Sequence, residues 1–152
     1  MGTEIERKFL VCGSFPEESS TRLVQAYLSL DRERTIRIRL DGPDDAFITI
    51  KGKTEGISRS EFEYAIPPED AEEMLKLAVG APIEKIRHRT PIGKHTWEVD
   101  VFSGENEGLV VAEIELESED EPFEKPDWIG EEVTSDSQYL NACLAQKPFS
   151  AW

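Results

Sequence analysis

The sequence predicts a mainly β protein of the α+β class, in which one sheet closes into a barrel around a charged interior. Two observations lead to this prediction. Most of the chain consists of short segments in which polar and apolar residues alternate, the period-two pattern of strands with two unlike faces. The charged residues on the polar faces also come in pairs of one sign, and such pairs can meet only if the sheet curls around them.

The composition fits one domain over residues 1–152 with room for a core, since 38% of the residues are hydrophobic and 32% are charged. No apolar run approaches the roughly 18 residues of a membrane span. The acidic start of the chain lacks the apolar stretch of a secretory signal. Cys12 and Cys143 are far apart and without metal-ligand spacing, which favours free thiols and a cytoplasmic location.

The formal net charge of −15 argues against binding to nucleic acid or to a membrane surface. It also opposes the approach of a polyanion. A phosphate-rich ligand would therefore need a shielded, locally positive site together with metal counterions.

The strands are expected in order along the chain. In Glu4–Val11, the residues Glu4, Glu6 and Lys8 share one face and Ile5 lies on the other. The same separation recurs in six later segments, which are Arg34–Leu40, Phe47–Lys53, Arg59–Ile66, Ile83–Arg89, Thr96–Phe102 and Leu109–Glu117. Loop signals separate the strands at Gly13–Ser20, Asp41–Asp45, Thr54–Ser58, Gly104–Gly108 and Glu119–Asp127.

Two short helices interrupt this pattern. The first begins at Pro67, and its apolar face consists of Ala71, Met74, Leu75 and Ala78, with Gly80 as the stop. The second follows Thr134 or Ser135 as the N-cap and places Tyr139, Ala142 and Cys143 on one side.

The charge pairs carry the functional argument. Any single strand fits the simpler interpretation of a sheet that shows its charged face to water. The strands taken together do not fit this interpretation. Like charges that are adjacent on a sheet repel each other, so a face that is merely exposed to water would be expected to carry both signs. The pairs are Glu4 and Glu6, Arg37 and Arg39, Lys51 and Lys53, Glu61 and Glu63, Lys85 and Arg87, Glu98 and Asp100, and Glu113 and Glu115.

We expect two subsites in the barrel interior. The cations suit phosphate oxygens; they are Lys8, Arg37, Arg39, Lys51, Lys53, Lys85 and Arg87. The carboxylates offer hard oxygen ligands, which favour Mg²⁺ or Mn²⁺ over zinc or copper; they are Glu4, Glu6, Glu61, Glu63, Asp100, Glu113 and Glu115.

The Glu-x-Glu-x-Lys motif at residues 4–8, followed by these pairs in this order, resembles the CYTH domain of the triphosphate tunnel metalloenzymes from Glu4 to Leu144. The resemblance implies an eight-stranded antiparallel tunnel that binds a triphosphate with two divalent ions. Arg22–Leu30 would be the eighth and least charged strand. The segment Glu131–Leu144 would supply a C-terminal helix that plugs one end.

The chain resembles the short bacterial members of this family. This resemblance implies that it hydrolyses inorganic tripolyphosphate to pyrophosphate and phosphate with a metal-activated water. In this hypothesis Lys8, Arg37, Arg39, Lys51 and Arg87 clamp the substrate. One ion lies between the Glu4/Glu6 and Glu113/Glu115 pairs, and a second lies near Glu61, Glu63 and Asp100. Lys85 neutralises the leaving group or assists the water, so Lys85, Glu63 and Arg87 are the catalytic candidates.

Other functions remain open from the sequence. A class IV adenylate cyclase, a thiamine triphosphatase or a nucleoside triphosphatase would need a pocket for a base or thiazolium ring, and no insertion for one is evident. A polyphosphate-binding module without catalysis and a plain acidic barrel are further alternatives. The family, and apolar outer faces such as Val99 and Val101, favour a homodimer.

Overall fold

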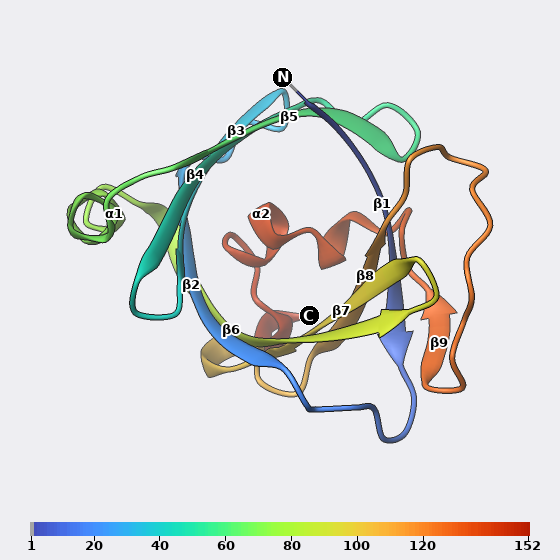
Figure 1. The fold of residues 1–152 in the computed structure, drawn as a ribbon. Coiled ribbons are helices and arrows are strands. Elements are labelled where there is room, and N and C mark those ends of the chain that lie inside the picture. The colour runs from blue at the N-terminus through green and yellow to red at the C-terminus, as the bar shows by residue number, and fades with distance from the viewer. Residues whose placement is uncertain (1) are drawn as a thin grey trace.

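The computed structural model describes residues 2–152, and its strands form one antiparallel sheet. The strands are β1 Gly2–Val11, β2 Ser20–Ser29, β3 Arg34–Asp41, β4 Asp45–Gly52, β5 Ser58–Ala65, β6 Val79–Ile92, β7 His95–Phe102, β8 Val110–Glu115 and β9 Ile129–Glu132. Eight of them close into a ring in the order β5-β4-β3-β2-β6-β7-β8-β1, and β1 pairs back with β5 (Figure 1). The predicted eight-stranded antiparallel barrel is confirmed, with β9 as one additional strand outside the ring.

Strand β1 joins three neighbours, and this arrangement shapes the interior. Its first residues, Gly2–Ile5, pair with β5, whereas Glu6–Leu10 pair with β8 on the other side. Near its end, Phe9 and Val11 pair with β9. Glu131 and Glu132 were expected to lead into a helix, but they lie in β9 because this segment completes the edge of β1.

The apolar faces of β1, β7 and β8 point away from the interior and are covered from outside. Phe9, Trp97 and Trp128 are buried together there, with edge-to-face contacts from Trp97 to Phe9 and to Trp128. The Trp97 indole N–H donates to the carbonyl of Glu124 at 3.2 Å, which ties the loop before β9 onto the barrel. Val99 is fully buried in the same cluster, so it cannot contribute to an exposed dimer face, and the homodimer stays a prediction.

Helix α1, Pro68–Leu75, packs on the outside of the barrel (Figure 1). Ala71 is fully buried against Ile38 of β3 and Ala46 of β4, and Met74 packs beside them. The predicted helix and its apolar face are confirmed, although it ends before Ala78. None of the helices in residues 2–152 is long and apolar enough to cross a membrane.

The C-terminal segment packs against one part of the barrel and lies within the outline of the ring in Figure 1. It contains a 3₁₀ turn at Ser137–Tyr139, helix α2 at Asn141–Leu144 and a last 3₁₀ turn at Phe149–Ala151. Leu144 and Ala145 are buried with Tyr27 of β2 and Phe102 of β7. The predicted second helix is therefore present but reduced to a single turn.

Candidate functional site

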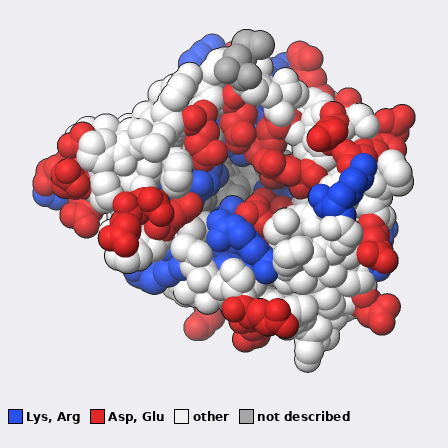
Figure 2. Space-filling view, in the orientation of Figure 1, with Lys and Arg blue, Asp and Glu red and all other residues white. Residues whose placement is uncertain are grey.

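The barrel encloses a cavity of about 890 Å³, and all eight strands of the ring contribute residues to its wall. Figure 2 shows its opening as a hollow with acidic side chains along the upper rim and basic side chains below them. Because alternate residues of a strand point to opposite faces, the apolar packing on the outside directs the charged residues inward. The charges that the sequence placed on one face of each strand thus line the cavity, where cations and carboxylates of different strands form ion pairs such as Lys51 with Glu4 and Lys8 with Glu113.

Most of the residues predicted for the site line this cavity. The cations among them are Lys8, Arg37, Arg39, Lys51, Lys53 and Arg87. The carboxylates among them are Glu4, Glu6, Glu61, Glu63, Glu113 and Glu115. Lys85 and Asp100 are placed differently, since both are buried in the wall behind the lining residues.

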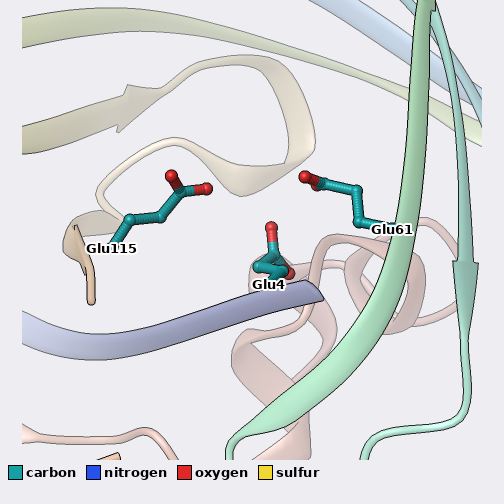
Figure 3. A group of neighbouring side chains, drawn as sticks. All are labelled: Glu4, Glu61 and Glu115. Atoms are coloured by element: carbon teal, nitrogen blue, oxygen red, sulfur yellow. The ribbon is translucent and has the colours of Figure 1, made fainter. Parts of the chain in front are cut away.

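Three carboxylates from three strands converge at one side of the cavity. Oxygen atoms of Glu4 on β1, Glu61 on β5 and Glu115 on β8 all lie within 4.8 Å of one another, and the side chains point toward a common centre (Figure 3). They meet because β1 changes its partner from β5 to β8 at this level. The sequence-based grouping had assigned Glu61 to a different ion from Glu4 and Glu115, whereas the fold brings these three together.

Burial and the repulsion between neighbouring carboxylates raise the pKa of two members of this acidic cluster. Burial, reinforced by the neighbouring charge of Glu4, raises the pKa of Glu61 to about 7. Burial and the charges of Glu4 and Glu98 also raise the pKa of Glu115. A cation between these carboxylates would remove the repulsion, and three oxygen ligands suit a hard divalent ion such as Mg²⁺ or Mn²⁺.

Glu4 is held by basic side chains from β5, which pairs with β1, and from β4 beside it. The Lys51 ammonium donates to both carboxylate oxygens at 2.9 and 2.8 Å. Burial alone would raise the pKa of Glu4, but the attraction of Lys51 outweighs it and lowers that pKa to about 2. Arg59 approaches the same carboxylate at 3.5 Å and lines the cavity. The sequence analysis missed Arg59, although it lies two residues before Glu61 and therefore on the same face of β5.

A second group of charges occupies the wall formed by β1, β6 and β8. Lys8 Nζ lies 3.2 Å from Glu113 and 3.5 Å from Glu6. Burial raises the pKa of Glu6 to about 7 with help from the charge of Glu113. For Glu113, burial acts in the same direction, but Lys8 and Arg87 outweigh it and hold its pKa well below the ordinary range. Glu6 is therefore the less well compensated carboxylate of the two.

Asp100 serves as the counter-ion of two buried cations. Its Oδ1 accepts from Arg87 Nε at 2.8 Å, and its Oδ2 accepts from Arg87 Nη2 at 2.9 Å and lies 2.8 Å from Lys85 Nζ. Burial would raise the pKa of Asp100, but these two cations lower it. Both oxygens are paired with these cations and the residue is 0% exposed, so Asp100 is a counter-ion in the wall, and its role as a metal ligand stays a prediction.

Lys85 is the least exposed of the predicted catalytic residues, with 1% of its surface accessible. Burial lowers its pKa to about 8, although the charge of Asp100 acts in the opposite direction. Besides Asp100, its ammonium donates to Asn141 of the C-terminal segment at 3.1 Å. The sequence analysis did not select Asn141, because only the fold brings it beside β6.

The opposite wall presents the two arginines of β3. Arg39 donates to Glu63 at 3.1 Å and to Asp41, and Thr49 also donates to Glu63 at 3.0 Å. Among residues 2–152, no acceptor contacts the buried Arg37 Nε. A buried guanidinium N–H without a partner is unfavourable, whereas the exposed part of the Arg37 guanidinium lines the cavity and suits an anionic ligand.

His95 contributes to the lining of the cavity as well as to packing. Its Nε2 lies 2.6 Å from Glu121 of the loop before β9. Both residues line the cavity, together with the neighbouring Lys94. His88, by contrast, packs against Phe15 in an edge-to-face contact.

Comparisons with known proteins agree with this geometry. The model of the CYTH domain family matches residues 2–147. The chain is 46% identical to an inorganic triphosphatase from Acetivibrio thermocellus, covering 98% of this chain and 97% of that protein. It is 39% identical to an inorganic triphosphatase from Nitrosomonas europaea, covering 94% and 97%.

Solved structures show the same fold. The inorganic triphosphatase NE1496 aligns with a TM-score of 0.66 and 36% identity, covering 93% of this chain and 97% of that one. A putative adenylate cyclase from Bacillus halodurans aligns with a TM-score of 0.60 and 16% identity, covering 78% and 84%, and this likeness concerns the fold alone. With the family match over nearly its whole length, this chain belongs to the CYTH domain family.

Proposed function

We propose that this protein hydrolyses inorganic tripolyphosphate to pyrophosphate and phosphate with the help of divalent metal ions. The observation that carries the proposal is the enclosed cavity in which a carboxylate cluster faces a wall of lysines and arginines. The cluster can bind cations, the wall can bind phosphates, and a metal triphosphate needs both. Two relatives named inorganic triphosphatase, 46% and 39% identical along nearly the whole chain, support the same assignment.

Glu4, Glu61 and Glu115 are the residues proposed to hold a divalent ion. They fit it because their oxygens converge and because two of the three have a raised pKa in its absence. Glu6, whose pKa is also raised, is the candidate to complete this site or to contact a second ion. Bound there, a divalent ion would withdraw charge from phosphate oxygens and lower the pKa of a bound water.

Lys51 links the two halves of the site. Its ammonium donates to both carboxylate oxygens of Glu4. Neutralising Glu4 with a cation weakens this ion pair, which releases Lys51 to bind phosphate oxygens instead. Metal and substrate would then assist each other's binding, and the net charge of −15 need not repel the metal-complexed substrate.

The remaining cations are proposed to position the phosphates. Arg37 and Arg39 offer guanidinium N–H groups from one wall, and Lys8 and Arg87 offer donors from the other. Phosphoryl transfer requires mainly such positioning and charge stabilisation. Lys85 lies behind the lining and is 1% exposed, so it is proposed to stabilise the charge of the leaving phosphate from within the wall.

The lining favours a bare phosphate chain over a nucleotide or a thiamine ester. Among the cavity-lining residues of the described chain, Tyr27 is the one Phe, Tyr or Trp, and it is only 4% exposed. A base or thiazolium ring would normally stack on an exposed aromatic or apolar surface. The cavity instead offers charge on nearly every strand.

The test is to measure the products released from tripolyphosphate, pyrophosphate, ATP and thiamine triphosphate, each with Mg²⁺, with Mn²⁺ and with EDTA. We expect metal-dependent turnover that is fastest on tripolyphosphate and absent with EDTA. Formation of cyclic AMP together with pyrophosphate from ATP as the main reaction would identify a cyclase instead. Tight binding of tripolyphosphate without turnover under any condition would identify a binding module.

A further inference from the structure

Asn141, the first residue of α2, connects the C-terminal segment to the charged network through a side-chain hydrogen bond with Lys85. Its Oδ1 accepts from Lys85 Nζ at 3.1 Å. Asn141 lines the cavity, whereas Lys85 lies behind the lining and is 1% exposed. A ligand in the cavity can therefore contact the same Asn141 side chain that accepts a hydrogen bond from Lys85.

The chemistry of the two side chains fixes the orientation of the amide. A lysine ammonium has only donors, so the amide atom that faces it has to be the oxygen. The Asn141 amide nitrogen, with two N–H donors, then lies on the other side of the group. No residue between 2 and 152 accepts a hydrogen bond from this nitrogen, and since Asn141 borders the cavity, its donors are available to an anion.

The segment that carries Asn141 is anchored to the barrel. Leu144 and Ala145, 1% and 3% exposed, are buried against residues of β2, β6 and β7. The Ala81 amide donates to the carbonyl of Ala145 at 2.9 Å. The Phe149 amide donates to the Asn106 side chain at 2.8 Å. Asn141 is thus held from behind by packing and does not depend on its own side-chain contact to stay in place.

We propose that Asn141 is a positioning residue for the reaction: its Oδ1 orients Lys85, and its amide N–H donors contact a phosphate of the substrate. This inference rests on the proposed function of the cavity. It makes the C-terminal segment part of the substrate site, since α2 then supplies a hydrogen-bonding group as well as packing at the barrel wall.

The test compares three variants in steady-state kinetics with tripolyphosphate and Mg²⁺. Asn141→Leu has a similar volume but neither acceptor nor donor, and we expect its kcat to fall roughly tenfold to a hundredfold, the loss typical of one hydrogen bond to a charged group. Asn141→Asp keeps an oxygen for Lys85 but replaces the donor with a second acceptor. We expect it to retain more of the wild-type kcat and to raise KM. Gln146→Ala, an exposed change in the same segment, is the control and should match wild type.

Thermal melting of each variant separates positioning from a structural role. If Asn141→Leu has the kcat and KM of wild type, or if its lost activity equals its lost folded fraction, the proposal is wrong. The same holds if the Leu and Asp variants are kinetically indistinguishable. If wild type itself does not turn over tripolyphosphate, the proposed function fails and calorimetric binding of tripolyphosphate decides the inference. Weaker binding by Asn141→Asp than by Gln146→Ala supports the donor contact, and equal binding overturns it.

Discussion

Replacing Glu61 by Gln removes one negative charge from the carboxylate cluster and leaves the shape of the side chain almost unchanged. In the metal-free protein, burial and the neighbouring Glu4 raise the pKa of Glu61 to about 7. At pH 8 the folded protein therefore carries a charge that it accommodates poorly. We expect Glu61→Gln to stabilise the metal-free protein at this pH, while it removes one of the proposed metal ligands.

The size of the effect follows from the pKa and from the exposure of the side chain. An increase from 4.5 to about 7 corresponds to on the order of 3 kcal/mol at a pH above both values. The Glu61 side chain is 23% exposed, so solvent screening reduces the expected gain to about 1–2 kcal/mol. For a chain of 152 residues this raises Tm by about 3–6 °C.

The sign depends on pH. A carboxyl group whose folded-state pKa is raised stabilises the fold while it is protonated, and this contribution is lost as the pH rises through about 7. Neutral Glu61 resembles Gln, so the wild type and the variant should melt together near pH 4.5. The difference in Tm should then grow until about pH 8.

Calorimetric melting with EDTA, at a series of pH values, measures this difference. Glu63→Gln is the matched control, because Glu63 lies on the same face of β5 but accepts from Arg39 at 3.1 Å and from Thr49 at 3.0 Å. Its replacement should not stabilise the protein. Equal melting of wild type and Glu61→Gln at pH 8, or an offset that does not change with pH, would refute the argument from charge repulsion.

Three further substitutions test other parts of the structure. Lys51→Met should raise KM for tripolyphosphate roughly tenfold to a hundredfold, because one charge-assisted contact is lost; unchanged kinetics would exclude Lys51 from the clamp. Asp100→Asn should destabilise the protein by about 3–5 kcal/mol in urea unfolding, since two buried cations lose their counter-ion, and a small loss would show that they are paired otherwise. Gly80→Ala should lower Tm and the free energy of unfolding by about 1 kcal/mol or more, because φ at Gly80 is +77° and a Cβ would lie 2.8 Å from the Ala145 carbonyl oxygen; a neutral result would mean that the backbone shifts freely there.

Local patterns made the barrel interior predictable. Arg37 and Arg39, or Glu61 and Glu63, share a face because side chains alternate along any strand, whatever the strand pairs with. Helix α1 was also predictable, since Pro67 and the spacing of Ala71 and Met74 act within the segment itself. The second helix was predicted to follow Thr134 or Ser135, but Ser137–Tyr139 form a 3₁₀ turn and α2 begins only at Asn141. The segment before it is tied to β1, since Val133 donates to the Lys8 carbonyl at 2.8 Å.

The sequence by itself determined which residues face the interior and that both signs of charge meet there. The tertiary structure decided which of them meet one another. Glu4, Glu61 and Glu115 converge because β1 pairs with β5 and then with β8, and such long-range register leaves no trace in a local pattern. Packing likewise withdrew Asp100 behind the wall as a counter-ion and brought Asn141 to Lys85, since these contacts depend on how distant segments fill the same space.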